Sequence, residues 1–285
     1  MQLPAYFDEQ DESFGLAARA AAAAGAIIRD GYQQVHEISQ KEVGDLVSRI
    51  DFEADKAACA ILGTPDDKLL IVSEELNPDQ YQPSDDMWIV DPLDGTTAYL
   101  MGGGPGIPSV LIAKQISGKI VLGIVYFPLT DEWFYAVRGR GAYRNGKRLL
   151  MENESLDLTS CWVEMNQYGN VLFETDFFAA ARRALRSSKG ARIVTSGFPS
   201  AGVAMRIAEQ ASGLKVAIHD NCPESVKQGP WDIAATQLIF EEAGGVFVNP
   251  ELERISPFRA EPIIVAPSIQ LAARIVELSS SFAAL

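Results

Sequence analysis

Hydrophobic residues in the first part of the chain recur with the period of two helices. Residues 14–29 form an alanine-rich run that ends before Gly31, and Ser13 stands where a helix cap is expected. A second set of apolar residues, spaced three or four apart, predicts a helix over residues 48–62 that Gly63 ends. We therefore expect two helices before the first strand.

Five shorter apolar runs have the length and composition of buried strands. They lie at residues 69–72, 88–90, 110–113, 120–127 and 132–137. Short polar connections separate the last three runs, which predicts an antiparallel meander. Asn145-Gly146 then marks the tight turn of a further hairpin. The first two runs each end in acidic residues.

The second half of the chain alternates between helical and strand-like segments. Helices are predicted at residues 175–185, 201–211, 233–243 and 268–278, and strands at 191–195, 214–218, 246–248 and 263–266. We predict an α+β half, residues 1–152, and an α/β half, residues 153–285. Because no long linker separates them, the two halves are expected to pack as one body.

The composition is that of a soluble globular protein, since 47% of the 285 residues are hydrophobic and 22% are charged. A formal net charge of −14 repels phosphate backbones, so we expect no nucleic-acid partner. The apolar stretch at residues 20–28 is too short to span a bilayer, so we expect no membrane segment. Three cysteines without a CxxC spacing predict reduced thiols and a cytoplasmic protein.

One acidic motif follows a predicted buried strand and has the features of a metal site. Asp91 and Asp94 lie three residues apart around Pro92, whose fixed φ makes the bend rigid. Two carboxylates aimed at one spot repel each other, so a divalent cation is their natural partner. Gly95 and Thr96 then resemble a helix start, where free N–H groups favour a phosphate. Metal ligands beside an anion cradle indicate phosphoryl chemistry.

Other acidic positions are ordinary when each is considered alone. Glu74 and Glu75 end a strand, as solvated carboxylates commonly do, and Asp51 begins a helix. Asp232 stands where the N-cap of the following helix is expected. His219 has no partner at zinc spacing, so the sequence does not predict a zinc site.

Taken together, these motifs resemble the inositol monophosphatase family of lithium-sensitive, magnesium-dependent phosphatases over residues 16–266. The motifs are Lys41…Asp45-Leu46-Val47…Asp51, Ser73-Glu74-Glu75, Asp91-Pro92-Leu93-Asp94-Gly95-Thr96-Thr97, Trp231-Asp232-Ile233-Ala234-Ala235 and Glu242-Ala243-Gly244-Gly245. The resemblance implies a layered αβαβα sugar-phosphatase fold with its site between the two halves.

The resemblance also implies a role for each motif residue. Two or three Mg²⁺ ions are expected on Glu74, Asp91, the Leu93 carbonyl, Asp94 and Asp232. The substrate phosphate is expected at Asp94, Gly95, Thr96 and Asp232. Catalysis is expected from Thr96, Asp51 and Glu74 acting on a water, with Lys41 and Glu75 in support. The implied activity is hydrolysis of inositol monophosphate or a similar small sugar phosphate by a cytoplasmic homodimer.

The specificity region departs from the family pattern and leaves alternatives open. Inositol-selective members carry an acidic residue about seven positions before the W-D aspartate, where this chain has Ser225, and Lys227 is nearby. A lysine there could pair with a second phosphate. The alternative substrates are therefore a 3′(2′),5′-bisphosphate nucleotide or fructose 1,6-bisphosphate. A non-catalytic regulatory or binding protein on the same fold is the alternative from another class.

Overall fold

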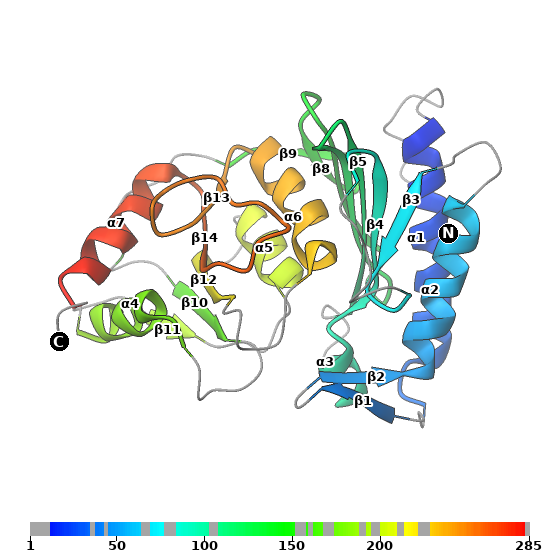
Figure 1. Ribbon diagram of the computed structural model, residues 1–285, viewed down its shortest axis with the longest axis horizontal. Coiled ribbons are helices and arrows are strands. Elements are labelled where there is room, and N and C mark those ends of the chain that lie inside the picture. Colours follow the sequence, from blue (N-terminus) through cyan, green and yellow to red (C-terminus); the bar gives the residue numbers. More distant parts are fainter. Residues whose placement is uncertain are drawn as a thin grey trace.

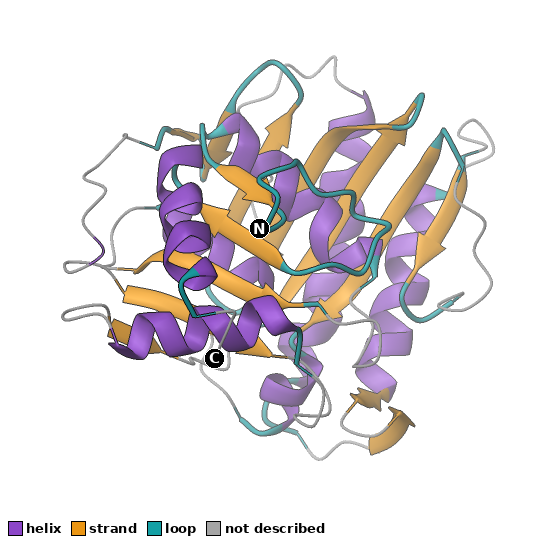
Figure 2. Ribbon diagram, turned by 60° about the vertical axis from the view of Figure 1, so that its left-hand side comes forward, coloured by secondary structure: helices purple, strands orange, loops and turns teal. Residues whose placement is uncertain are grey.

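The computed structural model describes residues 12–34, 38–42, 45–63, 69–76, 84–102, 108–151, 158, 162–167, 174–187, 192–194, 200–209, 214–221 and 229–282. Two β-sheets of seven and five strands alternate with three layers of helices (Figures 1 and 2). The layered αβαβα arrangement implied by the family resemblance is confirmed. No described helix is both long and apolar enough to cross a membrane.

Helices α1 (Glu12–Gly31) and α2 (Arg49–Leu62) cover the outer face of the seven-stranded sheet (Figure 1). The helix predicted over residues 48–62 is α2, and the Ser48 hydroxyl caps it by accepting a hydrogen bond from the Ile50 N–H. Ser13 is not a cap, because α1 begins before it and its hydroxyl accepts from Lys114 Nζ at 2.9 Å.

A small hairpin of β1 (Ile38–Glu42) and β2 (Asp45–Ser48) precedes α2, where no strand is predicted from the sequence. Five residues with mixed polarity give no clear period of two, so the pattern does not reveal such a strand. The hairpin leads directly into Ser48 and fixes the start of α2.

The seven-stranded sheet has the order β3-β4-β5-β6-β7-β8-β9. Its strands are β3 (Leu70–Ser73), β4 (Met87–Asp94), β5 (Ser109–Ile116), β6 (Lys119–Phe127), β7 (Glu132–Val137), β8 (Ala142–Arg144) and β9 (Lys147–Leu149). β3 is parallel to β4 and every later neighbour is antiparallel, so the predicted meander is confirmed. Asn145 and Gly146 both have positive φ, which is the geometry of the predicted hairpin turn.

The five-stranded sheet has the order β11-β10-β12-β14-β13 and is mixed. Its strands are β10 (Trp162–Gln167), β11 (Arg192–Val194), β12 (Leu214–Asp220), β13 (Val246–Val248) and β14 (Ile263–Ala266). β11 and β12 match the strands predicted at residues 191–195 and 214–218, whereas β10, which is parallel to both, is not predicted. The predicted α/β alternation is wrong for β13 and β14, which pair antiparallel because no crossover helix separates them.

Helices α5 (Ser200–Ala208) and α6 (Pro230–Glu242) lie between the sheets, while α4 (Asp176–Ser187) and α7 (Ile269–Ser280) cover the outer side of the smaller sheet (Figure 1). α6 is buried along most of its length. Gly123 of β6 permits its close approach, since a Cβ there would lie 2.7 Å from the Ala235 carbonyl oxygen. This contact fixes α6, which carries Asp232, against the larger sheet.

Four charged side chains also join the two halves. Arg144 of β8 contacts Glu132 of β7, and its Nε lies 2.8 Å from Glu209 Oε1, just beyond α5. Arg206 of α5 contacts the same two carboxylates, at 3.1 Å for Glu209 and 3.5 Å for Glu132. Each carboxylate therefore meets two guanidinium groups. The division into residues 1–152 and 153–285 itself stays a prediction.

Candidate metal centre

The acidic motif at the end of β4 is held in place by its own strand and by β5. The strand register shifts between Asp91 and Asp94, so the two carboxylates leave the regular alternation of the strand. The Leu93 N–H donates to Asp91 Oδ1 at 2.9 Å, and the Ser109 hydroxyl donates to Asp94 Oδ2 at 3.1 Å. Asp91 and Asp94 are both buried, at 1% and 7% exposure.

Asp232 reaches the same region from the first turn of α6. It is not the N-cap that the sequence predicts, because Gly229 occupies that position and Pro230 is the first helical residue. Proline is favoured at the first helical position, where its missing N–H costs nothing. Asp232 is the third residue of the helix, and its Oδ2 accepts the Gly229 N–H at 2.7 Å.

The three aspartates converge on one point. One oxygen each from Asp91, Asp94 and Asp232 lies within 4.8 Å of the others. Burial, followed by the charges of Glu74 and neighbouring aspartates, raises the pKa of Asp91 and of Asp232 well above the ordinary value. Burial also raises the pKa of Asp94 to about 7, although the Ser109 hydrogen bond opposes the change. The ionised carboxylates of the cluster therefore repel one another.

Glu74 belongs to this electrostatic cluster, since its charge raises the pKa of Asp91, Asp94 and Asp232. It directly follows β3, and its N–H donates to the Val90 carbonyl of β4 at 3.2 Å. Parallel pairing therefore places Glu74 at the same end of the sheet as the aspartates. Glu75 is half-buried beside it in the chain, and its supporting role stays a prediction.

Asp51 and Thr96 meet although they lie 45 residues apart in the chain. Thr96 Oγ1 is 2.7 Å from Asp51 Oδ1 and 3.0 Å from the Leu93 carbonyl oxygen. The other Asp51 oxygen, Oδ2, accepts from the N–H and the hydroxyl of Ser48 at 2.8 and 2.7 Å. The start of α2 thus fixes the Asp51 carboxylate with one oxygen toward Thr96.

Gly95 lets the chain turn sharply between the aspartates and Thr96. Its φ of 90° lies in the left-handed region that glycine favours, and the short helix α3 (Thr96–Leu100) follows. Lys41 belongs to β1, but its side chain lies outside the described part, as do Ser225 and Lys227. Their predicted roles therefore stay predictions.

The donor set fits a hard divalent cation. Asp91 Oδ2 is buried and has no hydrogen-bond partner among the described residues, so its lone pairs are available to a cation. The neighbouring groups are carboxylates and the Leu93 carbonyl, and the described cluster includes no histidine or cysteine. Oxygen-only sets of this kind suit Mg²⁺ and Ca²⁺ better than zinc or copper.

Sequence reasoning missed two residues that hold these carboxylates. Ser48 is predicted only as the first residue of the helix over residues 48–62, although a serine three residues before an acidic residue signals the reciprocal bond to Asp51. Ser109 had no local signal, because its contact with Asp94 depends on the register of β4 and β5.

The fold and the site together define a layered α+β protein with a buried carboxylate centre suited to divalent cations. The model of the inositol monophosphatase family matches residues 9–282. The chain therefore belongs to the inositol monophosphatase family.

Two curated relatives and one solved structure illustrate this relationship. The chain is 34% identical to inositol monophosphatase 2 of Solanum lycopersicum, over 84% of this chain and 88% of that protein. It is 31% identical to the Nus factor SuhB of Pasteurella multocida, over 81% and 82% of the two chains. The crystal structure of extragenic suppressor protein suhB from Bartonella henselae matches with a TM-score of 0.78 and 26% identity, over 94% and 98% of the chains.

Proposed function

We propose that the protein is a Mg²⁺-dependent phosphomonoesterase that hydrolyses inositol monophosphate or a similar small sugar phosphate. The observation that carries the proposal is the convergence of Asp91, Asp94 and Asp232 on one buried point. Such a cluster is unfavourable without a cation, and membership in the family supports a phosphatase activity.

Two or three Mg²⁺ ions would be held by Glu74, Asp91, the Leu93 carbonyl, Asp94 and Asp232. When bound, the ions would supply positive charge for the phosphate oxygens and lower the pKa of a coordinated water. The raised pKa values of the aspartates support this assignment, because a cation would restore their ionised forms.

Thr96 and Asp51 are proposed to remove a proton from the attacking water. Thr96 Oγ1 accepts the water proton while its own proton passes to Asp51 Oδ1 at 2.7 Å. The Ser48 bonds to Asp51 Oδ2 keep the carboxylate oriented during this transfer. Glu74 is proposed to assist in deprotonating the same water.

The substrate phosphate is proposed to lie beside the aspartates at the start of α3. Gly95 and Thr96 present backbone N–H groups there, since the first N–H groups of a helix have no partner within it. The left-handed φ of Gly95 turns this backbone next to Asp94. The phosphate would then meet N–H donors on one side and the carboxylate-held cations on the other.

The direct test is release of inorganic phosphate from inositol 1-phosphate, fructose 1,6-bisphosphate and 3′-phosphoadenosine 5′-phosphate. We expect turnover of inositol 1-phosphate with Mg²⁺, loss of turnover in EDTA, and inhibition by Li⁺. Selective turnover of either bisphosphate would replace the proposed substrate with a bisphosphate. An Asp94→Asn variant should be inactive, whereas Glu253→Gln, which changes an exposed carboxylate on a loop, should be fully active.

A regulatory role is the candidate from another class, because one relative is named as a Nus factor. Absence of phosphate release from a broad monoester panel with Mg²⁺ would favour that role and overturn the first proposal. A cytoplasmic location and a homodimer also remain proposals. Sedimentation velocity of the purified protein tests the homodimer, and a monomer at micromolar concentration would contradict it.

A further inference from the structure

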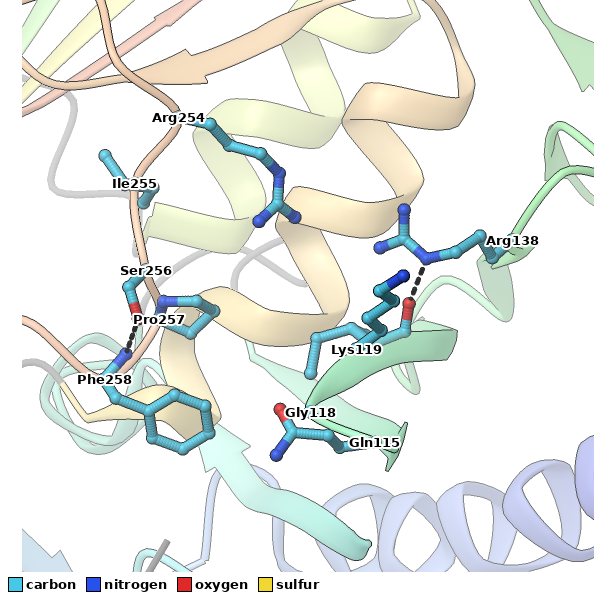
Figure 3. Close-up of a pocket in the computed structure, with 10 residues that line it drawn as sticks. Gln115, Gly118, Lys119, Arg138, Arg254, Ile255, Ser256, Pro257 and Phe258 are labelled. Carbon is cyan, nitrogen blue, oxygen red and sulfur yellow. Dashed lines mark hydrogen bonds between the residues drawn. The ribbon is translucent and has the colours of Figure 1, made fainter. Parts of the chain in front are cut away.

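A cavity of about 390 Å³ lies where the seven-stranded sheet meets the second half of the chain, apart from the metal centre. One wall is formed by the turn between β5 and β6 and by Arg138 after β7. The other wall is the segment at residues 254–258, between β13 and β14 (Figure 3). Cavities of this size are large enough for a small-molecule ligand.

This cavity is at the opposite end of the sheet from the metal centre. Asp94 pairs with Ser109 at one end of the β4–β5 ladder, whereas Met87 pairs with Gln115 at the other end. Gln115 lines the cavity. Because β4 is a strand of eight residues, the two ends are separated by about 23 Å at roughly 3.3 Å per residue. A ligand here would not touch the carboxylate cluster.

Three cationic side chains border the cavity in a chain whose net charge is −14. Arg254 donates to both oxygens of Glu241 at 2.7 and 2.9 Å, so that carboxylate offsets its charge. Arg138 Nε donates to the Ile120 carbonyl at 2.6 Å, which anchors the guanidinium by one edge. Its two terminal nitrogens point toward Arg254 across the cavity (Figure 3).

Lys119 lies beside Arg138 and reinforces its charge (Figure 3). Two carboxylates lie on this side: Asp85 Oδ1 is 3.5 Å from the position that a Cβ on Gly118 would occupy, and Asp86 Oδ1 accepts the Ser117 N–H at 2.7 Å. Glu242 accepts the N–H of Gly139, next to Arg138, at 2.8 Å. None of these carboxylates lines the cavity, whereas Lys119 and Arg138 do, so the charged groups that line it are cationic. A guanidinium whose two terminal nitrogens have no hydrogen bond to the described residues, beside an ammonium group, is suited to a phosphate.

The opposite end of the cavity is aromatic and amide-lined. The Phe258 ring and the Gln115 amide lie away from Arg138 and Arg254 (Figure 3). Gln115 is held in place by its Nε2, which donates to the Ser84 carbonyl at 2.7 Å. The Phe258 ring offers a face or an edge against which a planar group of a ligand can pack. The fixed Gln115 amide can form a hydrogen bond to polar atoms on the edge of that planar group.

We propose that this cavity binds a phosphate monoester that carries a planar ring. The phosphate contacts Lys119 and Arg138, and the ring lies toward Phe258 and Gln115. The site does not depend on the phosphatase activity proposed above, because its residues are separate from the metal ligands. Its occupant bridges the two halves of the protein and should raise the stability of the folded state.

Isothermal titration calorimetry with AMP, adenosine and inorganic phosphate tests the proposal. EDTA is included so that the metal-free carboxylate cluster repels AMP and inorganic phosphate and AMP is not hydrolysed. We expect AMP to bind more tightly than either fragment and to raise the melting temperature. Lys119→Gln and Arg138→Gln should each weaken AMP binding about tenfold, which corresponds to loss of one charge-assisted contact. Lys147→Gln, an exposed lysine on β9, should bind AMP like the unmodified protein.

Arg138→Gln loses the hydrogen bond to the Ile120 carbonyl and could unfold for that reason. Lys119 is exposed, so Lys119→Gln leaves the core intact and tests the proposal independently. No heat and no melting shift with AMP would overturn the proposal. Equal AMP binding by the unmodified protein and Lys119→Gln would also overturn it. Inorganic phosphate binding as tightly as AMP would refute the role given to Phe258 and to the planar ring.

Discussion

Asp94→Asn is expected to stabilise the metal-free protein while it abolishes activity. Asp94 is buried at 7% exposure, and burial together with the charge of Glu74 raises its pKa from the ordinary 3.8 to about 7. Asparagine has nearly the same shape and no charge, and its Oδ1 can still accept the Ser109 hydroxyl. The substitution thus removes the repulsion and keeps the hydrogen bond.

The sign and size of this effect follow from the raised pKa of Asp94. The folded state binds the proton more tightly than the unfolded state, so the stability of the metal-free protein falls as the pH rises from about 4 to about 7. Above pH 7, the ionised Asp94 costs about 4 kcal/mol, at 1.36 kcal/mol per pKa unit. We expect Asp94→Asn to recover about 2–4 kcal/mol at pH 8 and much less at pH 5.

Urea unfolding in EDTA at pH 5 and pH 8 measures this difference, with Glu253→Gln as the exposed carboxylate control. Added Mg²⁺ should raise the stability of the unmodified protein at pH 8 and leave Asp94→Asn nearly unchanged. Loss of stability of metal-free Asp94→Asn at pH 8 would refute the reasoning. So would a gain of the same size at both pH values.

Three further substitutions have expected outcomes. Thr96→Val keeps the shape but removes the hydroxyl, so kcat for phosphate release should fall about 10²–10⁴-fold while Mg²⁺ still raises the melting temperature. Gly123→Ala places a Cβ 2.7 Å from a carbonyl of α6 and should cost about 1–3 kcal/mol in urea unfolding. Glu209→Gln removes the charge that Arg144 and Arg206 share, and it should cost about 1–3 kcal/mol in the same assay.

Each of these outcomes can fail in a defined way. Normal kcat in Thr96→Val would exclude its hydroxyl from proton transfer. Unchanged stability of Gly123→Ala would mean that α6 can move away from β6 without loss. If Glu209→Gln matched the unmodified protein in low and high salt, the charged cluster between the halves would contribute no stability.

Much of the first half could be predicted from sequence because its signals are local. Ser48 and Gly63 bracket α2 by cap chemistry, and the meander is marked by short turns between apolar runs. The motif from Asp91 to Thr96 also indicated a carboxylate cluster, since it combines two carboxylates, a rigid bend and a glycine. The structure brings these groups together with Asp51 and Asp232.

The remainder depended on contacts between distant segments. The smaller sheet is mixed because β14 pairs antiparallel with β13, whereas β10, β11 and β12 are parallel. No local sequence pattern encodes the direction in which two strands pair. An aspartate before an apolar helical run can be either the N-cap or the third residue of the helix. For Asp232, only the position of Pro230 distinguishes the two. The Ser109 contact to Asp94 and the cavity near Arg138 likewise require the register of separate strands.

The central claim is that Asp91, Asp94 and Asp232 hold divalent cations. The most direct test is anomalous diffraction from a crystal soaked in Mn²⁺, which replaces Mg²⁺ and scatters X-rays anomalously. The account predicts strong anomalous peaks within about 2.0–2.3 Å of oxygens from all three aspartates, and their absence in an Asp94→Asn crystal. Anomalous density confined to the protein surface, with the three carboxylates uncoordinated, would contradict it.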